Sequence, residues 1–281
     1  MKICVLASGS RGNCILIQSE TTRILIDAGL SARQTLRRLE PLGLKGEDID
    51  GILIGHEHGD HTRGLRVLAR NVDLPVFMNR ATADAVVEKA PLSAKIRIFT
   101  NGQPWTLGDL MIEAFPVYHD AQDPVGFSIS NERVKLVVAT DLGMATRVVK
   151  QACRGARVIV LEANHDRSLL VEGSRPWSLK QRIKSSRGHL SNEEAAELLS
   201  RDTDHNLTDV FLAHLSRDCN RPELALGVVG EKLRSANRGH VRIHLTYQGR
   251  ISEVVEVKGK PITRSPEPSP PVHSQMALPL D

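Results

Sequence analysis

The sequence predicts a layered α/β fold. Short apolar runs with the composition of β-strands alternate along the chain with segments of helical periodicity. Hydrophobic residues make up 41% of the chain but aromatic residues only 3%, so Val, Leu, Ile and Ala must form the core. Cores of this kind are common in layered α/β proteins. A length of 281 residues allows one large domain or two small ones.

The first part of the chain is predicted to open with a β-hairpin. Residues 2–6 and 14–17 are apolar runs on either side of the turn-rich segment 8–13. Residues 23–29 form a third predicted strand, which carries Asp27 near its end and precedes a predicted helix over 31–39. The elements predicted next are strands over 51–55, 75–78 and 95–99, a helix over 62–69 that begins at Thr62, and a helix over 81–89.

The second part of the chain continues this alternation. Its predicted strands cover residues 110–117, 124–129, 134–139, 157–161 and 208–213. Helices are predicted to begin near Ala145, after the capping box of Ser191 and Glu194, and near Arg221. Residues 241–246 and 251–257 are predicted to close the domain as a terminal hairpin around residues 248–250.

The composition changes at Lys258. From there on the chain is rich in Pro and Ser and shows no periodicity, so it cannot bury enough apolar surface to order itself. We therefore predict a folded domain over residues 1–258 and a flexible Pro/Ser-rich tail over residues 259–281.

Several classes of protein are disfavoured by composition. No apolar run reaches the roughly 18 residues of a membrane span, and the first residues lack a signal-peptide pattern, so we expect a cytoplasmic protein without a membrane partner. The cysteines lack C-x-x-C spacing, which favours buried free thiols over a zinc-thiolate site or disulfides. A net charge of +4 favours a polyanionic partner only weakly.

The most informative segment is residues 56–61, with the sequence HEHGDH, between a predicted strand and a predicted helix. His56 and His58 alternate as in an extended chain and can point the same way, whereas Asp60 and His61 lie further round the turn. Two metal centres are therefore easier to build than one. Imidazole nitrogen and carboxylate oxygen suit Zn, Mn and Fe. The alternatives are a solvated polar loop or a single zinc site.

Polar side chains also end several other predicted strands. Taken alone, each would be a surface residue or a turn cap. Asp141 follows an apolar strand and precedes a glycine and a predicted helix. The other polar residues at or just after the ends of predicted strands are Asp27, His119, Glu162, His165 and His214.

The HEHGDH segment resembles the H-x-H-x-D-H signature of the metallo-β-lactamase fold, a family that includes ribonuclease Z and other phosphodiesterases. The later metal-binding motifs follow in the family's order, and the resemblance covers residues 1–257. It implies a four-layer αββα sandwich that forms a hydrolase domain over residues 1–258. It also implies two divalent metal ions, Zn or Mn or possibly Fe, with water activated between them as the nucleophile.

The resemblance assigns roles to the strand-end residues. One metal ion would take His56, His58 and His119, the other Asp60, His61 and His214, and Asp141 would bridge them. Asp60 and His189 are the expected catalytic residues. Asp27, Glu162 and His165 would support the metal ligands from behind.

The second half of the chain argues for a phosphodiester substrate. The segment 188–191 resembles the phosphate-binding, proton-donating histidine loop of ribonuclease Z, and His189 lies just before a predicted helix, whose N-terminus favours anions. A basic segment with one tryptophan precedes it and is the predicted nucleic-acid track. Its predicted contact residues are Arg175, Trp177, Lys180, Arg182, Lys184 and Arg187. A solvated amphipathic helix is the alternative.

Four segments narrow the resemblance to one subfamily. Residues 8–13, 161–166, 188–192 and 212–216 look like those of the bacterial YycJ/WalJ subfamily, whose members are thought to be 5′ DNA exonucleases. The resemblance implies a 5′ to 3′ DNA exonuclease of replication or repair, with DNA as the preferred nucleic acid. The alternatives are a ribonuclease Z-like RNA hydrolase, a small-molecule phosphodiesterase or thiolester hydrolase, and a non-enzymatic metal-bound scaffold.

The tail ends with an apolar segment over residues 275–281. The Q-x-x-L-x-L spacing of Gln275, Leu278 and Leu280 resembles the short peptide by which bacterial replication and repair proteins bind the DNA sliding clamp. On a flexible tether, such a peptide would raise the local concentration of the enzyme on DNA. A tail with incidental apolar residues is the alternative.

Overall fold

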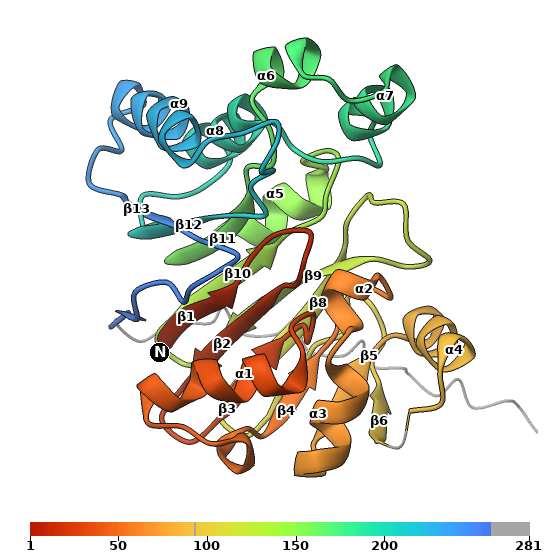
Figure 1. Cartoon of the computed structure of the whole chain (residues 1–281). Helices are drawn as coiled ribbons and strands as arrows, with labels where there is room; N and C mark the ends of the chain where they lie inside the picture. The colour runs from red at the N-terminus through yellow and green to blue at the C-terminus, as the bar shows by residue number, and fades with distance from the viewer. Residues whose placement is uncertain (93, 260–281) are drawn as a thin grey trace, which may run out of the picture.

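The computed structural model describes residues 1–92 and 94–259. All but the first residue of the predicted tail lie outside this range, as do the clamp-binding candidates Gln275, Leu278 and Leu280. Within the described residues the strands form two seven-stranded sheets (Figure 1). The first has the order β14-β1-β2-β3-β4-β5-β6 and the second the order β13-β12-β11-β10-β9-β8-β7.

The strands of the first sheet come from the first hundred residues and from the last described segment. Their bounds are β1 Lys2–Ala7, β2 Cys14–Gln18, β3 Arg23–Ile26, β4 Gly51–Leu53, β5 Pro75–Met78, β6 Lys95–Ile98 and β14 Val255–Glu256. The helices that accompany this sheet are α1 Ala32–Leu39, α2 Gly59–Thr62, α3 Leu65–Val72 and α4 Arg80–Lys89, with short 3-10 turns at Glu40–Leu42 and Gly46–Asp48.

The strands of the second sheet, β7 to β13, follow one another along the chain. Its strands are β7 Trp105–Leu107, β8 Leu110–Pro116, β9 Val125–Ser130, β10 Lys135–Ala139, β11 Val158–Glu162, β12 Asp209–Ala213 and β13 Arg242–Leu245. Its helices are α5 Arg147–Cys153, α6 Arg167–Glu172, α7 Trp177–Lys184, α8 Asn192–Arg201 and α9 Pro222–Ser235. The capping box predicted at the start of α8 is present.

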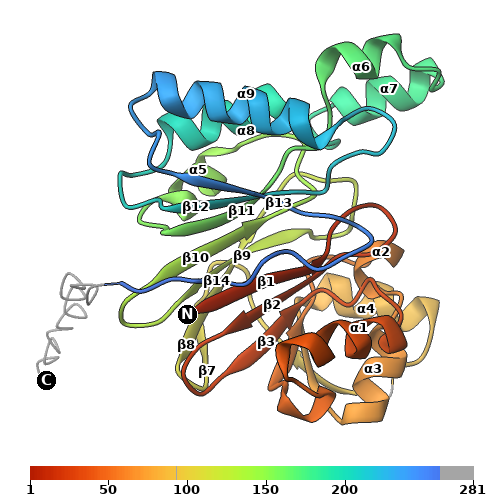
Figure 2. The same ribbon diagram turned by 60° about the vertical axis from the view of Figure 1, so that its left-hand side comes forward.

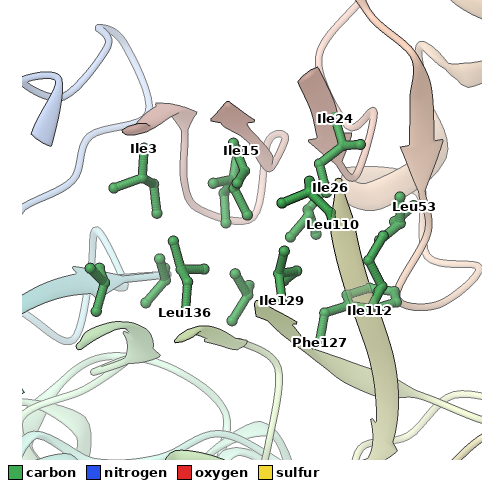
Figure 3. Packing of buried hydrophobic residues seen from close by; sticks show 14 of the residues in the cluster. Ile3, Ile15, Ile24, Ile26, Leu53, Leu110, Ile112, Phe127, Ile129 and Leu136 are labelled. Atoms are coloured by element: carbon green, nitrogen blue, oxygen red, sulfur yellow. The ribbon is translucent and has the colours of Figure 1, made fainter. Parts of the chain in front are cut away.

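The two sheets pack face to face, and their inner surfaces form the central core. Ile3, Ile15 and Ile24 of the first sheet face Ile129 and Leu136 of the second (Figure 3). Separate apolar clusters join each sheet to its own helices, α1, α3 and α4 on one side and α5, α8 and α9 on the other (Figure 2). The αββα sandwich predicted from the sequence is therefore confirmed.

The predicted terminal hairpin is wrong. β13 pairs in parallel with β12 in the second sheet, whereas β14 pairs antiparallel with β1 in the first. The segment between them crosses from one sheet to the other, and Ser252 accepts a hydrogen bond from the Val5 amide on the way. Two apolar runs around a short turn look alike in sequence whether they pair with each other or with different sheets.

The helix predicted to begin at Thr62 begins three residues earlier. α2 starts at Gly59, and the Thr62 hydroxyl donates back to the His58 carbonyl instead of capping a helix. The helical segment is divided before Leu65 because the Gly64 amide donates to Ala28, in the loop that follows β3. A Cβ at Gly64 would lie 1.8 Å from the Leu30 carbonyl oxygen, so only glycine fits there.

Three loops are held together below the HEHGDH segment. The Asn13 amide donates to Asp60 O at 2.8 Å, and the Gly29 amide donates to Asn13 O at 2.9 Å. A Cβ at Gly29 would lie 1.6 Å from Asp60 O. The absence of a side chain at Gly29 therefore allows the loop that carries Asp60 to pack directly against the Gly29 backbone.

We expect Gly29→Ala to destabilise the fold by about 1–3 kcal/mol, because the added methyl group must push the Asp60 backbone away. Gly227→Ala is the matched control, since Gly227 lies in α9 with no atom within 4 Å of its would-be Cβ. Alanine there should leave the stability unchanged or raise it by up to about 1 kcal/mol. Urea unfolding measures both. Equal urea midpoints for Gly29→Ala and wild type would show that the close approach of Gly29 to Asp60 O does not limit the stability of the fold.

Candidate metal centre

The predicted metal ligands and Asp27 come together where strands of both sheets end. Asp27 follows β3, residues 56–61 follow β4, His119 follows β8, Asp141 follows β10 and His214 follows β12. Asp27, Asp141 and His214 have positive φ angles of 63°, 54° and 54°. Left-handed backbone is strained for residues other than glycine and often accompanies functional sites. Here it turns each side chain sharply at the end of its strand.

Three imidazoles form the first ligand cluster. His56, His58 and His119 each offer a ring nitrogen, and these nitrogens lie within 4.8 Å of one another. The His56 and His58 ring centroids are 4.6 Å apart, and each lies 5.2 Å from the His119 ring. An all-imidazole set of three suits a transition-metal ion.

The second cluster contains Asp60, His61, Asp141 and His214. His61 Nε2 lies 3.0 Å from Asp141 Oδ2, and His214 Nε2 lies 3.5 Å from both Asp60 Oδ2 and Asp141 Oδ1. The Asp141 Oδ1 atom is also 3.9 Å from His119 Nε2 of the first cluster. The Asp141 carboxylate therefore lies between the two clusters.

Hydrogen bonds behind the imidazoles orient them. Asp27 Oδ2 lies 2.7 Å from His61 Nδ1, while Asp27 Oδ1 accepts the Gly55 amide. Because a carboxylate only accepts, His61 Nδ1 carries a hydrogen and Nε2 faces the centre. His214 Nδ1 pairs with Glu162 Oε1 at 2.9 Å in the same way. Such partners fix the ring orientation of metal-binding histidines.

The donor set fits divalent cations. Among the described residues, the buried polar atoms without a hydrogen-bond partner include His56 Nε2, His214 Nε2 and Asp141 Oδ2. Leaving such atoms unsatisfied in a protein interior costs free energy, so they are normally paired. One metal ion in each cluster would satisfy these atoms. Imidazole nitrogens and carboxylate oxygens are ligand types that Zn and Mn accept.

Charge couples the members of the second cluster. Burial would raise the pKa of Asp141, but His214 and His61 outweigh it and hold that pKa well below its usual range. Burial likewise opposes protonation of His61, yet Asp27 and Asp141 raise its pKa well above the ordinary value. Because these carboxylates favour the protonated form of His61, protons compete with a metal ion for this imidazole, and metal binding is expected to release protons.

The first cluster behaves in the opposite way. Burial lowers the pKa of His56, and the neighbouring His61 lowers it further. Burial also lowers the pKa of His119, although Asp141 partly opposes this shift. Neutral imidazoles with free lone pairs are the form that binds metal ions.

His189 lies beside the second cluster and shares a partner with it. Its Nδ1 is 2.7 Å from Glu162 Oε1, the same oxygen that faces His214. The His189 side chain is 21% exposed, whereas those of His61 and His214 are 1% and 5% exposed. Ligand atoms of Asp141, Glu162, His189 and His214 all lie within 4.8 Å of one another. His189 is thus placed either to contact a substrate or to bind a metal ion.

Two further polar residues at the centre have no signal in the sequence. Asn13 Nδ2 lies 3.2 Å from Asp60 Oδ2 and 3.1 Å from His61 Nε2. Asp120 Oδ1 lies 3.2 Å from His119 Nε2. Asn13 belongs to a turn-rich joint between two strands, where asparagine is common for conformational reasons alone. Only the folded chain shows that it reaches the centre.

The predicted supporting residue His165 is buried near Glu162. It is 3% exposed, and its Nδ1 has no hydrogen-bond partner among the described residues. Burial lowers the pKa of His165, while Glu162 partly opposes this shift. Its backbone carbonyl accepts the Asn192 amide at the start of α8. No side-chain hydrogen bond joins His165 to the ligand clusters among the described residues, so its supporting role stays a prediction.

The predicted nucleic-acid track is only partly available. Lys180 is 9% exposed and donates to the Val171 carbonyl, so its prediction as a phosphate contact is wrong: helix packing turned it inward. Arg175 pairs with Asp218 and Arg182 with Asp120. The residues of this set that remain exposed without a partner in the described chain are Trp177, Lys184 and Arg187.

No helix in the described part of the chain is long and apolar enough to cross a membrane. All four cysteines lie in that part, and they are buried and free, as the sequence predicts.

Comparison with known proteins identifies the class. The family model of the beta-lactamase superfamily domain matches residues 22–207. The metallo-beta-lactamase fold protein YhfI from Bacillus subtilis superposes with a TM-score of 0.67 and 15% identity, over 89% of this chain and 98% of that one. Two facing sheets with a histidine and aspartate centre at their strand ends therefore define a metallo-β-lactamase fold.

Two relatives narrow this class. Exodeoxyribonuclease YycJ of Bacillus anthracis is 40% identical over 84% of this chain and 90% of its own. Exodeoxyribonuclease WalJ of Streptococcus pneumoniae D39 is 38% identical over 85% of this chain and 90% of its own. The chain therefore belongs to the beta-lactamase superfamily and, within it, to the family of YycJ and WalJ.

We expect Asp27→Asn to lower metal affinity about 10- to 100-fold, because an amide nitrogen facing His61 Nδ1 would favour the wrong imidazole tautomer. Asparagine tolerates the left-handed backbone at this position. Asp73→Asn is the control, since Asp73 is exposed, has a φ of 51° and forms a surface ion pair with Lys95. The test is to measure the metal content of each variant after competition with a chelator. Identical retention in both variants would remove Asp27 from the metal site.

Proposed function

We propose that this chain is a two-metal phosphodiesterase that degrades DNA from the 5′ end in replication or repair. The observation that carries the proposal is the position of the Asp141 carboxylate between an all-histidine cluster and a mixed cluster. The names of the relatives YycJ and WalJ support the exonuclease assignment.

The residues present would hold two ions. His56, His58 and His119 would bind one and Asp60, His61 and His214 the other, with Asp141 as a shared ligand. When bound, the ions would stabilise charge that develops on the phosphate and make water a better nucleophile. Zn and Mn are the expected metals, and Fe is compatible with the same ligands.

His189 is the proposed general acid. Burial would lower its pKa, but the Glu162 carboxylate outweighs this effect and raises it, so the imidazolium persists to higher pH. Glu162 occupies Nδ1, which leaves Nε2 as the donor for the leaving oxygen. Proton donation to a poor leaving group is a typical use of histidine. Asp60, whose carboxylate is 18% exposed, is the second proposed catalytic residue and faces the centre beside His214.

Exposed cations and an aromatic side chain of the basic segment are proposed to contact nucleic acid. Lys184 and Arg187 can neutralise phosphates, and Trp177, which is 63% exposed, can stack on a base. The sliding-clamp hypothesis for Gln275, Leu278 and Leu280 and the cytoplasmic location stay predictions.

The substrate class is tested with purified protein, Mn²⁺ or Zn²⁺, and end-labelled single- and double-stranded DNA and RNA beside a thiolester. We expect DNA to be shortened progressively from its 5′ end. Faster cleavage of RNA would favour a ribonuclease Z-like activity, and turnover of the thiolester alone would contradict the phosphodiesterase assignment.

Asp141→Asn is expected to abolish hydrolysis and to reduce the metal content below two ions per chain, because an amide cannot bridge two cations. Asparagine accepts the left-handed backbone at this position, so the fold should survive. Elemental analysis and DNA hydrolysis are measured together. A fully active wild-type enzyme with a single metal ion per chain would overturn the two-metal arrangement.

His189→Ala should lower the turnover of DNA by about two to four orders of magnitude, the usual contribution of general acid catalysis, with metal content unchanged. A p-nitrophenyl phosphodiester has a good leaving group, so its turnover should fall much less. His240→Ala, an exposed histidine far along the sequence, is the control. Loss of a metal ion from His189→Ala would instead make His189 a ligand.

A further inference from the structure

A groove with a volume of about 660 Å³ opens beside the metal centre, on segments that none of the predicted site residues occupies. Four parts of the chain line it: the loop between β1 and β2, the segment after His214, the start of α9 and the loop after β13. The first and last of these loops lie side by side in Figure 2. They are joined by hydrogen bonds from the Ser8 amide to Tyr247 O and from Gln248 Nε2 to Gly12 O.

The groove is strongly cationic. Arg11, Arg217, Arg221 and Arg250 line it, and Glu223 is the acidic residue among its lining residues. None of these four guanidinium groups forms an ion pair with a carboxylate of the described chain. By contrast, the basic segment predicted from the sequence has two of its arginines in salt bridges. Unpaired arginine side chains are available for phosphate oxygens.

Hydrogen bonds connect the groove wall to the segment that carries His214. The Ser8 hydroxyl, in the groove wall, accepts the His214 amide at 2.7 Å. Leu215 and Ser216 follow His214 directly and also line the groove. The Ser216 amide donates to Asn164 O, and Asn164 Nδ2 donates to His214 O. The wall of the groove is therefore fixed relative to His214, one of the candidate metal ligands.

One wall carries a cation–π pair. The Arg250 Cζ atom lies over the Tyr247 ring, 3.9 Å from the ring centroid. Bases of single strands stack on aromatic rings and on guanidinium planes. This pair can therefore contact a base through its flat faces, while the N–H groups at the edge of the Arg250 guanidinium can still contact a phosphate.

We propose that this groove binds the sugar-phosphate backbone of the substrate strand next to the phosphodiester that is cleaved. The inference rests on the proposed nuclease function and adds the path of the strand. Arg217, Arg221 and Arg250 carry the phosphate contacts. The strand passes between the loop after β1 and the start of α9 before it reaches His214.

The test is a triple substitution, Arg217→Gln, Arg221→Gln and Arg250→Gln, in the full-length, metal-loaded enzyme. The control triple, Arg37→Gln, Arg70→Gln and Arg97→Gln, removes the same charge from exposed positions on α1, α3 and β6. Affinity for a single-stranded DNA with phosphorothioate linkages is measured at several salt concentrations. Hydrolysis of bis(p-nitrophenyl) phosphate, which is too small to need the groove, reports on the metal centre.

We expect the groove triple to weaken DNA binding at least about tenfold and to lower the slope of log affinity against log salt by about two, since three phosphate contacts on a single strand are lost. The control triple should keep the slope of wild type, and both should hydrolyse bis(p-nitrophenyl) phosphate like wild type.

A groove triple with the wild-type salt slope would overturn the strand path while leaving the nuclease function intact. The same holds if substitution of Lys184 and Arg187 lowers the slope and the groove triple does not. A wild-type enzyme that neither binds nor cleaves DNA would overturn both proposals.

Discussion

The contact between Asp141 and His61 unites the two halves of the molecule at the point where chemistry is possible. Asp141 ends a strand of the second sheet, and His61 lies in the short helix after a strand of the first. Their side chains meet at 3.0 Å, and both are almost fully buried. A buried carboxylate is stable only with compensating partners. The centre therefore exists only when the sheets are packed face to face.

Bringing these side chains together requires strained backbone conformations and very close backbone contacts. Asp27, Asp141 and His214 adopt left-handed conformations at their strand ends, and Gly29 and Gly64 allow backbone contacts that no side chain would permit. Such strain is tolerated when surrounding packing is strong. Here the apolar layer between the sheets and the two outer helical layers supply it.

Glu162 links the metal centre to the proton donor. One of its oxygens faces both His189 and His214, and the other accepts the Leu142 amide. Its pKa is about 2, because burial, which would raise it, is outweighed mainly by His189. A permanently charged carboxylate can thus orient a proposed ligand and raise the pKa of the proposed acid together. The groove wall contacts the His214 backbone through Ser8, and His214 shares Glu162 with His189, so the strand path, the ligand and the acid that we propose are linked through neighbouring residues.

The sequence alone determined the class of fold and the candidate metal ligands, because both depend on local patterns, but it did not reveal that Asn13 and Asp120 contact those ligands. Strand and helix periods are visible in single segments, and HEHGDH places four candidate ligands within six residues. Tertiary structure decided what depends on contacts between distant segments: the pairing of β13 and β14 with different sheets, the burial of Lys180, and the gathering of groove arginines from four parts of the chain. The periodicity of apolar residues indicates which face of its own helix or strand a side chain occupies. Which other elements it meets is set by how the sheets pack, and no local pattern carries that information.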